Sequence, residues 1–137
     1  MIVFVDTNVI IDFVCKRDNF YNNAKKIFAL GYLGELELRM SSLSIINTMY
    51  IGKKYGIATI KERLKAILKF VEVYSIETDI VIEALDSDWE DYEDAVQFKS
   101  ATKVYADCIV TRNKKDFTRS DIPVYTVDEL LDSLIIK

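Results

Sequence analysis

The stretch Ile2-Val3-Phe4-Val5-Asp6-Thr7-Asn8 decides the fold, because an apolar run rich in β-branched residues ends abruptly in polar ones. A short run without polar alternation is typical of a strand buried on both faces of a parallel sheet. Thr7 or Asn8 can cap the helix that we expect to follow, up to about Phe13, and Asp6 itself supports a structural interpretation as the N-cap. The Asp6 carboxylate would then lie beside apolar surroundings, where its charge needs a partner or a cation.

Strand-like and helix-like segments alternate along the rest of the chain. Further strands are predicted over residues 37–41, 73–76, 108–111 and 124–125. Helices are predicted over about 24–33, 42–56, 60–71, 78–85, 87–105 and 127–134. The helix from residue 87 is expected because Ser87 and Glu90 have the spacing of a capping box. This alternation predicts a parallel sheet covered by helices on both faces.

The composition indicates one compact domain over residues 1–137. Half of the 137 residues are hydrophobic, and four glycines and one proline leave no flexible linker. Cys15 and Cys108 both lie in apolar runs, which predicts two small core residues and no disulfide framework. No segment has the length of a signal peptide core or of a membrane span, so we expect a soluble, cytoplasmic protein without membrane contact.

The charge and the missing histidine restrict the chemistry. A formal net charge of −4 argues against a passive nucleic-acid binder, because phosphate neutralisation dominates such binding. It argues less against a metallonuclease, in which metal ions and a local basic rim can meet the phosphate. With no histidine in the chain, Ser-His-Asp catalysis and histidine metal ligands are excluded.

Polar residues follow several of the predicted strands. In parallel α/β folds the site lies beyond the carboxyl ends of the strands. We therefore expect these residues to converge on one rim of the sheet: Asp6, Ser42, Ser44, Asn113 and Asp116.

An acidic segment, Asp88-Trp89-Glu90-Asp91-Tyr92-Glu93-Asp94-Ala95, precedes a helical pattern. Acidic side chains in a first helical turn favour the helix dipole, and this structural interpretation suits Asp88 and Glu90. Asp94 is different, because it lies deeper in the predicted helix. Asp91 and Asp94 are three residues apart, so they share a face that can reach the rim holding Asp6.

The segment Val110-Thr111-Arg112-Asn113-Lys114-Lys115-Asp116-Phe117 supports two interpretations. One is a loop in which Asn113 takes a left-handed turn and Asp116 acts as a cap. The other places Asn113 and Asp116 near a metal, with the basic residues of the segment against phosphate. Hard cations such as Mg²⁺ prefer oxygen ligands, and they can orient water and stabilise charge on a phosphate.

Taken together, the segments at 2–8, 41–47, 91–95 and 109–117 resemble the PIN domain family, which includes VapC-type toxins of toxin–antitoxin pairs. The resemblance implies a three-layer α/β/α sandwich, PIN-like, with a central mostly parallel sheet. It implies a metal-dependent ribonuclease using Mg²⁺ or Mn²⁺, often a homodimer, and the toxin of a type II toxin–antitoxin pair. It also implies a groove around Tyr50, Tyr55 and the 57–71 helix that receives an antitoxin segment.

The resemblance also implies an acidic quartet, in which Asp6 matches the first acid and Asp94 the third. The second acid falls at Asn47 and the fourth at Asn113, and Asp91, Glu93 or Asp116 can compensate for the missing charges. The predicted catalytic residues are Asp6, Asp94, Asn113 and Asp116, and the predicted metal ligands are Asp6, Asp91, Asp94 and Asp116. The predicted substrate-binding residues are Thr7, Asn8, Ser44, Asn47, Thr111, Arg112, Lys114 and Lys115.

Two alternatives stay open. The asparagines at 47 and 113 motivate a catalytically weakened binding module of the same fold, which acts through a protein or RNA partner. The other is a phosphoryl-transfer protein on a similar sheet. Such a phosphatase needs a second aspartate where Asn8 stands, and a nucleotide-binding fold needs a glycine-rich turn after the first strand.

Overall fold

A central sheet, all of whose strand pairs are parallel, organises the chain in the computed structural model, which describes residues 1–135. Among those residues its strand order is β3-β2-β1-β4-β5. The strands are β1 (Ile2–Val5), β2 (Glu37–Ser41), β3 (Val71–Tyr74), β4 (Cys108–Val110) and β5 (Val124–Tyr125). The apolar run at the amino terminus therefore lies mid-sheet, as predicted.

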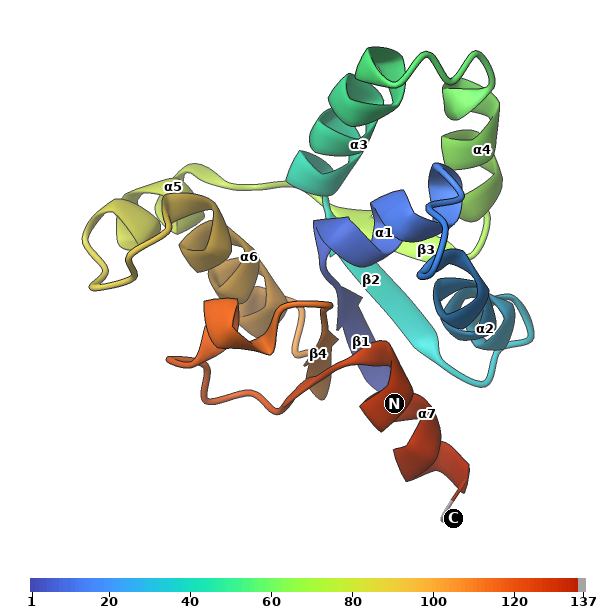
Figure 1. Cartoon of the computed structure of the whole chain (residues 1–137). Helices are drawn as coiled ribbons and strands as arrows, with labels where there is room; N and C mark the ends of the chain where they lie inside the picture. The colour runs from blue at the N-terminus through green and yellow to red at the C-terminus, as the bar shows by residue number, and fades with distance from the viewer. Residues whose placement is uncertain (136–137) are drawn as a thin grey trace.

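Helices cover both faces of the sheet, which confirms the three-layer α/β/α sandwich (Figure 1). The helices are α1 (Thr7–Val14), α2 (Tyr21–Tyr32), α3 (Ser42–Lys54), α4 (Ile60–Ile67), α5 (Thr78–Leu85), α6 (Tyr92–Lys103) and α7 (Val127–Ile135), with a 3-10 helix η1 (Lys114–Phe117). Within residues 1–135, no helix is both long and apolar enough to cross a membrane.

Alternate residues of the buried strands point to opposite faces, so the core has two sides. Val3 and Val5 pack in the cluster formed with α1, α2, α4 and α7. Phe4 and Ile109 pack instead against Phe98 and the rest of the α6 side. Because β1 is completely buried on both faces from Val3 to Val5, Asp6 is held at the carboxyl edge of a rigid central strand.

Several predicted boundaries are wrong. The third strand begins at Val71, which pairs with Leu38 of β2, so the amphipathic helix before it ends at Ile67 rather than near residue 71. The Ser87 capping box does not open a helix, because the Ser87 hydroxyl instead donates to the Ala84 carbonyl at the end of α5. Helix α6 begins only at Tyr92.

The caps and cysteines also differ from expectation in detail. Asp6 holds the cap position of α1, as its structural interpretation predicted, in place of Thr7 or Asn8. Ser41 holds the cap position of α3 in place of Ser42 or Ser44. Cys108 is fully buried in the core as predicted, whereas Cys15 is only half-buried at its edge.

Candidate functional site

Asp6 lies at the carboxyl end of β1, where its backbone N–H donates to the Val110 carbonyl of the neighbouring strand. Its side chain is 7% exposed. Thr111 Oγ1 donates to one carboxylate oxygen over 2.9 Å, and Gln97 Nε2 donates to the other over 3.3 Å. Burial raises the pKa of Asp6 above its usual range, and these hydrogen bonds oppose the rise. Two neighbouring side chains thus orient the Asp6 carboxylate, and burial leaves it poorly solvated.

Gln97 connects the polar groups beneath this site, and the sequence interpretation missed it. It is 3% exposed, and its Oε1 accepts from Ser41 Oγ over 2.6 Å. Its Nε2 also lies 3.0 Å from Thr7 Oγ1 and 3.1 Å from Ser44 Oγ. Gln97 follows Asp94 by three residues on α6, which is the helical spacing that could have indicated its role.

Asp94 is a carboxyl group on which several other acidic charges of the site act. Its pKa rises to about 7, first because of burial and then because of the charges of Asp91, Asp116, Asp6 and Glu93. Asp91 is the N-cap of α6, and its Oδ1 accepts from the Asp94 backbone N–H over 3.0 Å. One oxygen of Asp91 therefore already caps the start of α6. The sequence interpretation had assigned a structural role at the start of this helix to Asp88 and Glu90.

These carboxylates open onto one cavity of about 570 Å³. It unites seven of the predicted site residues: Asp6, Thr7, Asn8, Asn47, Asp91, Asp94 and Asp116. It is also lined by Glu93, which was expected as one replacement for a missing charge, and by residues that were not predicted as site residues: Ile11, Arg17, Tyr50, Ile51 and Gln97. The topological expectation that residues following separate strands would converge is therefore correct for Asp6 and Asp116.

The predicted substrate contacts Ser44 and Thr111 lie behind this cavity rather than on its surface. Both are fully buried. Ser44 is 2.7 Å from Thr7 Oγ1, and Thr111 donates to Asp6. They support side chains that line the cavity, and burial leaves them no access to a substrate.

Arg112, predicted to contact phosphate, is instead held in an ion pair. Its Nε and Nη2 donate to the two oxygens of Asp12 over 3.0 and 3.2 Å, and its guanidinium lies 4.1 Å from the centre of the Phe20 ring. Asp12 is 3% exposed, and Arg17 approaches it to 3.7 Å. The pair ties the turn after β4 to α1, a contact across a hundred residues that sequence alone does not reveal.

Asn113, Lys114 and Lys115 also lie outside the cavity. Asn113 is exposed, and its backbone N–H donates to Thr111 Oγ1. Its φ of −122° excludes the left-handed turn considered for it. Lys114 is paired with Glu129 of α7 over 3.1 Å. Lys115 is exposed and forms no ion pair within residues 1–135.

Asn47 and Glu93 face one another across the cavity. The Asn47 amide on α3 donates a hydrogen bond to the Glu93 carboxylate on α6. Glu93 therefore brings a negative charge to the place where Asn47 supplies only an amide.

The residues present suit a hard divalent cation that keeps much of its water. Within residues 1–135, no three acidic, histidine or cysteine side chains are close enough together to enclose a metal ion directly. The donors are nevertheless all oxygens, and burial, followed by the charges of the neighbouring carboxylates, raises the pKa of Asp94. Mg²⁺ commonly meets only one or two protein carboxylates and retains several waters, so this donor set fits it.

Fold and cavity together define a parallel α/β/α protein with an acidic site at the carboxyl edge of its sheet. The model of the PIN domain family matches residues 2–115, and the chain belongs to this family. No curated protein matches the sequence.

Several solved structures have the same fold. A toxin–antitoxin complex from Klebsiella pneumoniae is 25% identical with a TM-score of 0.66, covering 91% of this chain and 97% of that one. VapBC2 from Rickettsia felis, bound to a DNA fragment from its promoter, is 20% identical with a TM-score of 0.68, covering 92% and 98%. VapC20 from Mycobacterium tuberculosis, a toxin that cleaves the sarcin-ricin loop, is 18% identical with a TM-score of 0.63, covering 78% and 86%.

Proposed function

We propose that this PIN domain is a metal-dependent endoribonuclease that hydrolyses RNA phosphodiester bonds. The observation that carries the proposal is the cavity lined by five carboxylates, in which burial first and the neighbouring charges second raise the pKa of Asp94 to about 7. Such crowding of like charge is costly in a folded protein unless a cation neutralises it. The similarity of this chain to a toxin that cleaves the sarcin-ricin loop supports RNA as the substrate.

Asp6, Asp94, Asp116 and the oxygen of Asp91 that does not cap α6 would hold Mg²⁺ or Mn²⁺, one or two of them directly and the others through water that the ion retains. Such an ion supplies an activated water and charge stabilisation on the phosphate. Gln97 and Thr111 fix the orientation of the Asp6 carboxylate through their hydrogen bonds.

The hydroxyl and amide groups at the cavity surface would contact the substrate. Thr7, Asn8 and Asn47 line the cavity beside the carboxylates. They offer hydrogen bonds without adding negative charge that would repel a phosphate. Glu93, held by the Asn47 amide, would supply the charge that Asn47 lacks.

We further propose that the chain is the toxin of a type II toxin–antitoxin pair, a cytoplasmic homodimer whose activity an antitoxin blocks. Similar chains occur in toxin–antitoxin complexes. Helix α3 and the residue that caps its end expose the large side chains of Ile46, Tyr50 and Tyr55, and Tyr50 also lines the cavity. Such exposed groups favour a protein partner.

Cleavage of labelled total RNA by the purified protein, free of antitoxin, tests the enzymatic proposal. We expect cutting with Mg²⁺ or Mn²⁺, none with EDTA, and none by Asp6→Asn. A folded protein that binds RNA or a protein partner but leaves RNA intact in every condition would instead support the catalytically weakened binding module.

Metal binding should depend on pH. Asp94 binds a cation only as the carboxylate, and its pKa of about 7 means that it is mostly protonated at pH 5.5. Proton competition should then weaken the apparent affinity for Mn²⁺ about 30-fold at pH 5.5 relative to pH 8. Isothermal titration of Mn²⁺ into the wild type and into Asp94→Asn measures this. Equal affinity at the two pH values would contradict a role for Asp94 in holding the metal.

A further inference from the structure

A second hollow adjoins the carboxylate cavity on the side of η1. It has a volume of about 350 Å³ and shares three lining residues with the cavity: Asp91, Asp94 and Asp116. An RNA strand whose scissile phosphate lies at the shared carboxylates therefore has a continuous path into this hollow.

Two cations, Lys115 and Arg119, line the second hollow. Both are exposed, and neither forms an ion pair within the part of the chain that the structure describes. The neighbouring cations Arg112 and Lys114 are each paired with a carboxylate. Lys115 and Arg119 thus remain available beside the site in a chain of net charge −4.

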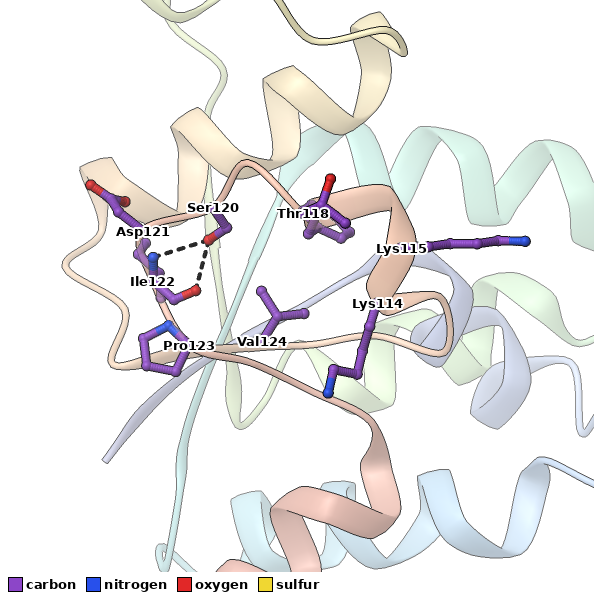
Figure 2. A pocket seen from close by; sticks show the side chains of 9 residues that line it. Lys114, Lys115, Thr118, Ser120, Asp121, Ile122, Pro123 and Val124 are labelled. Atoms are coloured by element: carbon purple, nitrogen blue, oxygen red, sulfur yellow. Dashed lines mark hydrogen bonds between the residues drawn. The ribbon is translucent and has the colours of Figure 1, made fainter.

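The adjoining third hollow, of about 510 Å³, makes the assignment of Lys115 clearer (Figure 2). Ile122, Pro123 and Val124 form an apolar wall there. Lys115 extends from η1 away from the apolar wall, while Lys114 points down toward the segment that leads to α7 (Figure 2). Both lysines line the third hollow, and of the two only Lys115 also lines the second.

Lys115 and Arg119 balance the negative charge of the second hollow once the shared carboxylates hold a cation. A divalent cation would offset two of the three charges of the shared aspartates, and the two cationic side chains would offset the third and that of Glu90. Basic grooves that follow the backbone are the usual means by which proteins bind single strands. Trp89, packed on Phe98 at 5.0 Å between ring centres, adds a fixed apolar surface to the hollow.

We propose that Lys115 and Arg119 form a subsite for the backbone phosphate of a nucleotide that flanks the scissile bond of single-stranded RNA. The proposal rests on the nuclease function above, which assigns the shared carboxylates to the metal. It adds a residue, Arg119, that belongs to neither the cavity nor the predicted site, and it removes Arg112 and Lys114 from the phosphate contacts.

Binding can be measured with a labelled 2′-O-methyl oligonucleotide of about 12 nucleotides, a length typical of single-strand sites, and a gel checks that it stays intact under the assay conditions. Fluorescence anisotropy in Mg²⁺ over a series of KCl concentrations gives the affinity and its salt slope. Lys115→Ala and Arg119→Ala should each weaken binding about five-fold and reduce the slope by about 0.7. The matched control is Lys26→Ala, which removes an exposed charge from α2 and should change neither quantity.

Affinities and slopes equal to those of the wild type in both variants would overturn the subsite, as would failure of the wild-type protein to bind the oligonucleotide. Cleavage of natural RNA, measured in parallel, tests the proposed nuclease function separately. A wild type that cuts RNA, with variants of unchanged affinity, would contradict the subsite alone. A wild type that binds through Lys115 and Arg119 without cutting would contradict only the nuclease function.

Discussion

Replacing Asp94 by asparagine should reduce RNA cleavage at least about 100-fold, which corresponds to ~2.7 kcal/mol of transition-state stabilisation. The same change should raise the melting temperature of the metal-free protein. The pKa of Asp94 is raised from 3.8 to about 7 in the folded state, so its ionised form opposes folding. This penalty is absent below pH 3.8, grows as the pH rises toward 7, and is complete above it. Asparagine removes the penalty.

The size of the stabilisation must be discounted, because Asp94 is only partly buried and solvent screens its charge. We expect a gain of about 1 kcal/mol at pH 8, or about 2 to 4 °C in melting temperature. Calorimetry in EDTA at pH 8 measures it, and the difference between variant and wild type should shrink at pH 4. Loss of cleavage together with a gain in stability distinguishes a site residue from one that only supports the fold.

Asp88→Asn is the matched control for this prediction. Asp88 is exposed and does not line the cavity, so cleavage and melting temperature should both stay close to wild type. If Asp88→Asn reduces cleavage as much as Asp94→Asn does, the face of α6 has been assigned incorrectly.

The fold could be predicted from the sequence because its strands are short apolar runs. The run at 2–5 and the pattern at 108–110 have no polar alternation, which only a strand buried on both faces allows. The boundaries near 71 and 91 were harder to predict. Val71 continues the helical spacing of the apolar residues before it, yet its pairing with Leu38 places it in the sheet.

The carboxylates of the site could be predicted in part, for a topological reason. Asp6 and Asp116 follow neighbouring parallel strands, so their convergence depends on strand order and little on side-chain detail. The roles of Gln97, Arg112 and Glu93 depend instead on contacts with residues 46 to 100 positions away or on the rotation of α6. From sequence alone, a cationic residue next to a predicted site is interpreted as a phosphate ligand. The structure shows that Arg112 instead pairs with Asp12.

Arg112→Met should destabilise the fold by about 3 kcal/mol, because it leaves the Asp12 charge buried without its main partner. The Asp12 side chain is 4% exposed, and that of Arg112 is 29% exposed. Arg17, at 3.7 Å, remains as a weaker partner, which keeps the loss at the lower end of the range for broken buried pairs. The Arg112 backbone N–H also donates to Asn8 Oδ1, so the main-chain contact between the turn and α1 survives the substitution. Urea unfolding measures the loss.

The pH dependence of the stability of Arg112→Met distinguishes two causes of the loss: the unpaired charge of Asp12 and the lost packing on Phe20. Burial already raises the pKa of Asp12 in the wild type, while Arg112 and Arg17 oppose that rise. Without Arg112 the pKa of Asp12 in the folded state should rise further above its unfolded value of 3.8. Ionised Asp12 then lowers the free energy of unfolding at pH values above 3.8, and this loss of stability becomes smaller as the pH falls. The cost of Arg112→Met should therefore be smaller at pH 4.5 than at pH 8. Asp12→Asn combined with Arg112→Met should recover most of the stability at pH 8. A cost that is equal at both pH values, and that the double variant does not reduce, would show that the guanidinium acts through its packing on Phe20 and not through its charge.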